Sequence, residues 1–261
     1  SEMCIRDSYE AELCAQVEAE GAALLKNDNN ALPLASGAKV SLFGHGSVDL
    51  MYGGTGSGSV DTSKAPNFKQ ALEDQGIQVN STLWDLYSSD DMMKNYSRIT
   101  PAAISDTLEA NTQYAVNEAP WSKLSSAESS FADYGDAAIV VFSRSGGEGA
   151  DLPSGENGTN DSWIKGQEGD GNYLALSAEE KELLQNLKTL KDNGTFKKII
   201  VLINSSNAIE MDFLNPEICG EDYGIDSAMW IGDVGQTGIN GVAQLLAGEV
   251  TPSGSLVDSY L

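Results

Sequence analysis

The sequence predicts an α/β fold, in which helices cover both faces of a mostly parallel sheet to form an αβα sandwich. Three observations predict it. Short runs of nearly unbroken apolar residues recur along the chain, as in strands that are buried on both faces. Polar or glycine-rich loops follow these runs, and segments with helical periodicity separate them. With 261 residues, of which 41% are hydrophobic, the chain can bury a full core.

Five apolar runs are the expected strands. They occupy residues 40–43, 77–79, 136–142, 198–203 and 227–231. In sheets of this class ligands bind beyond the carboxyl ends of the strands. A site is therefore expected in the loops that follow Phe43, Phe142, Ile203 and Ile231.

The expected helices lie before and between these runs. A helix is predicted over residues 177–191, because Ser177 and Glu180 have the spacing of a capping box. Further helical segments are predicted at residues 9–26, 66–75, 83–96, 122–131, 209–214 and 239–246.

The charge of the chain excludes several classes of partner. The net charge is -24, from 39 acidic and 15 basic residues. Such an acidic surface repels phosphate backbones and anionic lipids, so we expect neither a nucleic acid partner nor contact with a membrane. No run reaches the ~20 apolar residues that a membrane helix needs. Neutral ligands such as sugars are compatible with this charge.

Histidine and cysteine usage argues against a metal or cofactor. Cys4, Cys14 and Cys219 form no CxxC pair, and His45 is the single histidine, so no zinc site or disulfide framework is expected. The acidic loop at residues 156–170 does not match a calcium-binding loop. His45 could act as a general base beside a serine, but without a nucleophile elbow a loop hydrogen-bonding role is expected.

The first eight residues differ in character from the rest. Residues 1–8 (SEMCIRDS) resemble translated adapter sequence, so the expected domain is residues 9–261. We expect this domain to be truncated at both ends, which leaves an export signal and the localisation open.

Two segments contain candidate site residues. Residues 53–59 (GGTGSGS) let the backbone approach a ligand closely, but they match no Walker, GxGxxG or GxSxG pattern, and a flexible surface loop is the alternative. Glu148 lies between glycines after the run at 136–142. Glycosidic cleavage needs such a carboxyl group to protonate the leaving oxygen, with a second carboxylate opposite. A solvated surface carboxylate is the alternative for Glu148.

Taken in order, six segments resemble the second domain of glycoside hydrolase family 3. The resemblance covers roughly residues 9–261. The segments are residues 20–34 (EGAALLKN followed by LPL), 53–58 (GGTGSG), 147–151 (GEGAD), 201–207 (VLINSSN), 235–238 (GQTG) and 252–256 (PSGSL).

This resemblance implies part of a retaining exo-β-glycosidase, with β-glucosidase first and β-xylosidase second. The substrate would be a β-linked oligosaccharide or an aryl glycoside. By resemblance, Glu148 is the general acid/base, and Gly56, Ser57 and Asp151 bind the sugar. A (β/α)8 barrel of the same full-length protein supplies the aspartate nucleophile, so this chain alone is expected to be inactive.

Some features depart from the family pattern or leave alternatives open. Leu152 replaces the arginine that usually follows the aspartate of the motif. Glu156 and Glu168 remain weaker candidates for the acid/base, and the order of the two domains is open. A non-catalytic carbohydrate-binding or barrel-docking module is the main alternative. A nucleotide binder is the other, although no phosphate-binding lysine follows the glycine-rich tract.

Overall fold

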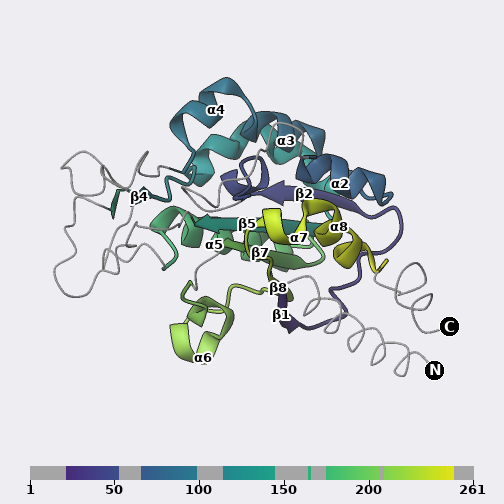
Figure 1. The fold of residues 1–261 in the computed structure, drawn as a ribbon. Coiled ribbons are helices and arrows are strands. Elements are labelled where there is room, and N and C mark those ends of the chain that lie inside the picture. Colours follow the sequence, from purple (N-terminus) through teal and green to yellow (C-terminus); the bar gives the residue numbers. More distant parts are fainter. Residues whose placement is uncertain are drawn as a thin grey trace.

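The fold is an α/β sandwich built on one six-stranded sheet (Figure 1). The computed structural model describes residues 22–52, 66–98, 114–144, 164–165, 175–205 and 209–249. The sheet has the strand order β1-β8-β7-β5-β2-β3. Its strands are β1 (Ala23–Asn27), β2 (Lys39–Phe43), β3 (Gln78–Val79), β5 (Ala137–Arg144), β7 (Ile199–Ser205) and β8 (Ser227–Trp230).

All neighbours in the sheet are parallel except β1, which pairs antiparallel with β8. A separate parallel pair consists of β4 (Tyr114–Ala115) and β6 (Ile164–Lys165). The predicted fold class, a mostly parallel sheet with helices on both faces, is therefore confirmed.

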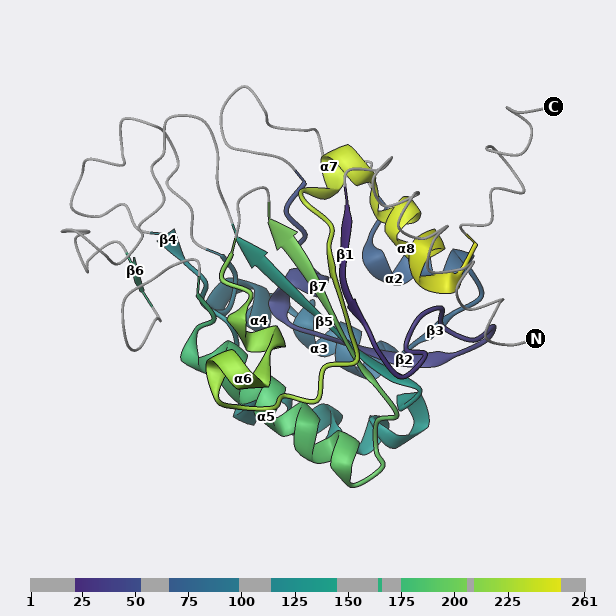
Figure 2. The ribbon, with the colours of Figure 1, turned by 90° about the horizontal axis from the view of Figure 1, so that it is seen from below.

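Helices cover the sheet from both sides (Figures 1 and 2). On one face lie α2 (Phe68–Asp74) and α8 (Ile239–Ala247), and on the other lie α3 (Ser81–Tyr87), α4 (Asp90–Asn95) and α5 (Ala178–Asp192). The shorter helical elements are η1 (His45–Ser47), η4 (Trp121–Ser130), η5 (Ala132–Tyr134), η7 (Asp212–Leu214), α6 (Pro216–Cys219) and α7 (Val234–Thr237). Within the described ranges no helix is long and apolar enough to cross a bilayer.

The core consists of two buried layers separated by the sheet. Successive side chains of a strand point to opposite faces. In β5, Ile139 and Val141 therefore join the layer under α2 and α8, whereas Val140 and Phe142 join the layer under α3 and α5. A strand buried on both faces has no solvent-facing position, which explains its nearly continuous apolar run.

Most of the predicted elements are present. The runs at 40–43, 77–79, 136–142, 198–203 and 227–231 form β2, β3, β5, β7 and β8, and the capping box of α5 is formed by Ser177 and Glu180. The segment at 122–131 is helical as the 3-10 element η4, whereas within 209–214 only Asp212–Leu214 are helical, as the 3-10 turn η7.

One prediction was wrong at the start of the described chain. Residues 23–26 belong to strand β1 and not to the helix predicted over 9–26, of which residues 9–21 lie outside the described part. Leu24 pairs with Met229 of β8 across the sheet. This long-range pairing overrides the helical pattern of the local sequence.

The order in which the chain adds strands to the sheet changes direction between β2 and β5. From β2 it continues to β3 on one side, whereas from β5 it continues to β7 and β8 on the other. The carboxyl ends of two neighbouring strands whose connections diverge in this way form a crevice, the topological switch point where ligands of open α/β sheets bind. A site is therefore expected beyond the ends of β2 and β5.

The burial of β5 predicts a large cost of truncation at its centre. Ile139→Ala should lower the free energy of unfolding by about 2–5 kcal/mol, because Ile139 is fully buried and its neighbours cannot close the cavity. Urea denaturation measures this change. Ile218→Ala is the control and should change stability by less than about 0.5 kcal/mol, since Ile218 is 70% exposed. Equal effects of the two substitutions would contradict the assigned core.

Candidate functional site

The turn after β2 packs directly on β5 at the switch point. Gly44 has a φ of 88°, and a Cβ on it would lie 2.6 Å from the carbonyl oxygen of Val141. A Cβ on Gly46 would lie 2.5 Å from Ser143 Oγ. Only glycine fits at position 44, where φ is positive and the clash is with backbone, and a side chain at position 46 would displace the hydroxyl of Ser143. These close approaches bring the first predicted loop against the end of the central strand.

A single buried side chain, that of Asn204, connects the loops at this edge. Its Oδ1 accepts hydrogen bonds from the backbone N–H of Met51 (2.6 Å) and from Ser143 Oγ (3.0 Å). Its Nδ2 donates to the carbonyl oxygens of Met51 (3.0 Å) and Gly232 (2.8 Å). Met51 also accepts a hydrogen bond from the N–H of Val234. The chain therefore enters residues 53–59 from a firmly held position.

The end of β5 is held by a buried ion pair. Arg144 is the last residue of the strand, and its guanidinium contacts both carboxylate oxygens of Glu180 in α5, at 2.9 and 2.6 Å. Both side chains are almost fully buried. Residue 148 follows four positions later in the sequence.

A buried carboxyl group supports the turn after β2. Both side-chain oxygens of Glu118 accept from the N–H of His45, at 3.1 and 3.2 Å, and Oε1 also accepts from the N–H of Ala119 at 3.1 Å. Burial, with a smaller contribution from the charge of Glu180, raises the pKa of Glu118 from its ordinary value of 4.5 to about 8. Glu118 is therefore mostly protonated at neutral pH.

His45 serves structure and not proton transfer. Its Nε2 lies 2.7 Å from the carbonyl oxygen of Val116, to which it donates. Burial, with the nearby charge of Arg98, lowers the pKa of His45 to about 3, so the ring stays neutral at physiological pH. The expected loop hydrogen-bonding role is confirmed, and a ring so inaccessible to substrate is a poor general base.

The sequence-predicted site residues lie outside the described part of the chain. These residues are Gly56, Ser57, Glu148 and Asp151, together with the alternatives Glu156 and Glu168. The structure does describe the residues that precede the two segments. Met51 and Tyr52 precede the segment with Gly56 and Ser57, and Arg144 precedes the segment with Glu148 and Asp151. Both sets of residues lie at the same edge of the sheet. The assignments themselves stay predictions.

Sequence reasoning missed three residues that build this edge: Asn204, Arg144 and Glu118. Asn204 directly follows an apolar run and Arg144 comes two positions after one, where a site is expected, and this placement was a usable signal. Glu118 gives no local signal among 39 acidic residues. Among the described side chains, no group of three or more His, Cys, Asp or Glu is arranged to hold a metal ion.

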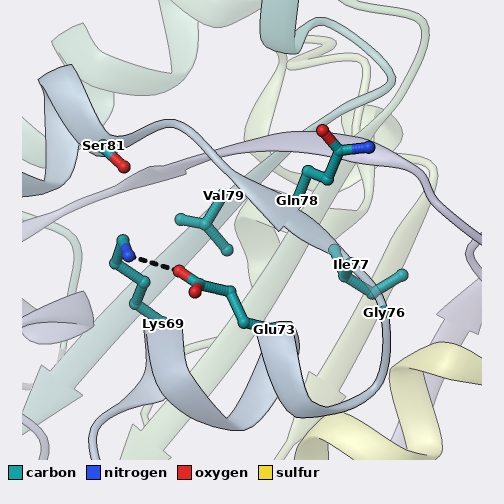
Figure 3. Close-up of a pocket in the computed structure, with 7 residues that line it drawn as sticks. All are labelled: Lys69, Glu73, Gly76, Ile77, Gln78, Val79 and Ser81. Atoms are coloured by element: carbon teal, nitrogen blue, oxygen red, sulfur yellow. Dashed lines mark ion pairs between the residues drawn. The ribbon is translucent and has the colours of Figure 1, made fainter.

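A surface pocket of about 350 Å³ lies elsewhere, between α2 and β3 (Figure 3). Lys69 and Glu73 of α2 form an ion pair with each other in it. Gln78 of β3 pairs with Lys39 at the beginning of β2, the end of that strand opposite to the switch point. The pocket therefore does not belong to the candidate site.

Comparison with known proteins identifies the family. The family model described as the glycosyl hydrolase family 3 C-terminal domain matches residues 22–260. The chain is 31% identical to a β-glucosidase of Ruminococcus albus over 95% of its own length and 22% of that protein. It is 30% identical to β-glucosidase A of Butyrivibrio fibrisolvens, over 95% of its own length and 28% of the relative.

Solved structures give the same result. β-Glucosidase 3B of Thermotoga neapolitana, in complex with glucose, matches with a TM-score of 0.60 and 25% identity, over 95% of this chain and 30% of that one. A β-glucosidase of Paenibacillus barengoltzii matches with a TM-score of 0.59 and 25% identity, over 92% and 23%. The chain thus spans less than a third of the length of these proteins.

Removing the amide of Asn204 should loosen the whole edge. Asn204→Leu leaves buried groups of Met51, Ser143 and Gly232 without this partner, so the free energy of unfolding should fall by about 3 kcal/mol or more. The control is Asn186→Leu, which removes one hydrogen bond within α5 and should cost less than about 1 kcal/mol. Urea denaturation of both variants tests this, and a small loss for Asn204→Leu would contradict it.

The raised pKa of Glu118 predicts a pH dependence of stability. The folded state binds this proton more tightly than the unfolded state. The protonated side chain therefore contributes its full share to the free energy of unfolding below pH 4.5, and this contribution is lost as pH rises towards 8. Glu118→Gln keeps an acceptor for the two backbone N–H groups and cannot ionise. The wild-type chain should therefore lose stability relative to Glu118→Gln between pH 5 and 8, as followed by thermal unfolding. A difference that does not change with pH would refute the assigned protonation.

Proposed function

Since the chain belongs to glycosyl hydrolase family 3 and matches its C-terminal domain, we propose that it forms part of a β-glucosidase. In this proposal residues 9–261 are the sandwich domain, and a (β/α)8 barrel of the same protein supplies the nucleophile. The substrate is a terminal β-linked glucose of an oligosaccharide or aryl glycoside, with a β-xyloside as the second choice. The names of the curated relatives support this substrate class.

In the proposed reaction Glu148 is the general acid/base of a double displacement. Its carboxyl group protonates the leaving oxygen while the barrel aspartate attacks the anomeric carbon, and a glycosyl-enzyme forms. The resulting carboxylate of Glu148 then takes a proton from water, which attacks the anomeric carbon and releases the sugar and the aspartate. Retention of configuration by this route requires the two carboxyl groups to lie about 5–5.5 Å apart.

One observation carries this proposal: the segments with the candidate residues depart from neighbouring strand ends at the switch point. The tract with Gly56 and Ser57 follows Met51, and the segment with Glu148 and Asp151 follows Arg144. Because ligands of open α/β sheets bind at such an edge, we propose that Gly56, Ser57 and Asp151 bind the sugar there. Without the barrel the chain carries half of the site and turns over no substrate.

The test is substitution of Glu148 in the full-length protein that contains the barrel. Glu148→Gln should lower kcat/KM for an alkyl β-glucoside by about 10²- to 10⁴-fold, because the leaving oxygen then receives no proton. Azide should restore turnover of an activated aryl glucoside by Glu148→Ala, since it replaces the missing base-activated water. Initial-rate kinetics with both substrates measure these effects.

Three further substitutions serve as controls and as alternatives. Glu128→Gln, exposed on η4, should leave activity unchanged. Glu156→Gln and Glu168→Gln test the other carboxyl groups that follow β5. Activity of Glu148→Gln close to that of the unmodified protein would overturn the acid/base role, and a large loss in one of the other two would reassign it.

A further inference from the structure

The ion pair between Arg144 and Glu180 joins the two ends of the segment that carries Glu148. Nη2 of Arg144 donates to the carbonyl oxygen of Ala175 at 2.8 Å, and Nη1 donates to the carbonyl oxygen of Ser143 at 2.9 Å. Residues 145–174, of which the structure describes only 164–165, connect Arg144 to Ala175 in the sequence. The guanidinium of Arg144 thus links the backbone at the two residues that flank this segment, Arg144 and Ala175.

The orientation of this guanidinium is set by the start of α5. Oε1 of Glu180 accepts from the N–H of Ser177 at 2.9 Å, and Ser177 Oγ accepts from the N–H of Glu180 at 3.2 Å. The capping box therefore fixes the carboxylate before it binds Arg144 through two parallel hydrogen bonds. A bidentate contact of this kind fixes both distance and direction, which a single-point contact of a lysine does not.

Stability alone does not account for such a pair. Burying two charges costs free energy that their attraction often only offsets, and replacing a buried ion pair by well-packed apolar side chains is often neutral or stabilising. What apolar packing does not provide is a fixed geometry between the backbone of residue 144 and that of residue 175. The pair lies where the segment that contains Glu148 begins and ends. Its geometry is therefore relevant to the catalytic role proposed for Glu148.

We propose that Arg144, oriented by Glu180, is a positioning residue: it fixes the backbone at residues 144 and 175, which flank the segment that contains Glu148. It acts through the backbone on either side of that segment and does not itself contact the substrate. The inference rests on the proposed acid/base role of Glu148. It predicts that breaking the pair impairs proton donation more than it impairs substrate binding.

The test uses the full-length protein and compares two substrates that differ in leaving group. An alkyl β-glucoside needs a proton on its leaving oxygen, whereas a dinitrophenyl β-glucoside does not. Arg144→Met should lower kcat/KM for the alkyl substrate by about tenfold or more, because small displacements of a catalytic group are costly. The dinitrophenyl substrate should lose less than about threefold, since it bypasses the acid.

A second ion pair of α5 supplies the matched control. Lys191 contacts Asp226 at 2.9 Å, near the end of the helix remote from the capping box. Lys191→Met should lower stability without changing the ratio of the two kcat/KM values. Arg144→Lys keeps the charge but cannot make the bidentate contact with Glu180. Its ratio of the two kcat/KM values should lie between those of the unmodified protein and Arg144→Met. Where Arg144→Met does not fold, Arg144→Lys and Glu180→Gln carry the test.

The outcomes separate the two proposals. If Glu148→Gln changes the ratio but the folded variants of Arg144 and Glu180 lower both kcat/KM values equally, the pair is only structural and the positioning role is wrong. If Glu148→Gln itself leaves the ratio unchanged, the acid/base assignment fails and the positioning role fails with it. A selective loss for the alkyl substrate in the Arg144 and Glu180 variants supports both.

Discussion

The amide of Asn204 is the interaction on which the carboxyl edge of the sheet depends. A side-chain amide offers two acceptor and two donor directions, and Asn204, which is fully buried, uses all four. Its partners follow or belong to β2, β5 and β8, and Asn204 itself belongs to β7. One side chain therefore sets four neighbouring strand ends relative to one another, and no purely apolar or charged residue offers the same combination of donors and acceptors.

The central strand β5 has an apolar middle and a polar end, and the two parts contribute differently to the fold. The middle of β5 is apolar and buried on both faces, so it contributes to stability through the removal of surface from water. Its last two residues, Ser143 and Arg144, are polar and equally buried, but each has hydrogen-bond partners on another strand or helix. Buried polar groups that are fully satisfied define a geometry, so the end of β5 has a fixed position relative to its neighbours.

The elements that depend on local pattern could be predicted from the sequence. The runs of β5 and β7 and the spacing of Ser177 and Glu180 needed no knowledge of distant residues. By contrast, β1 depends on pairing with β8, and Arg144 and Glu180 meet across 36 positions, so no local pattern reveals either. For Glu148 the loop chemistry alone was indecisive among 39 acidic residues, and the family resemblance made the assignment.

The closed base formed by Arg144, Glu180 and Ala175 also bears on how such a domain can diversify. When both ends of a segment are held by the scaffold, the entropic cost of closing it rises only slowly with its length, by about 0.6 kcal/mol for each doubling. This entropic term alone thus sets only a small cost on a change in the number of residues between Arg144 and Ala175. The length and sequence of this segment can thus change under one selection pressure while the folding of the domain stays under another.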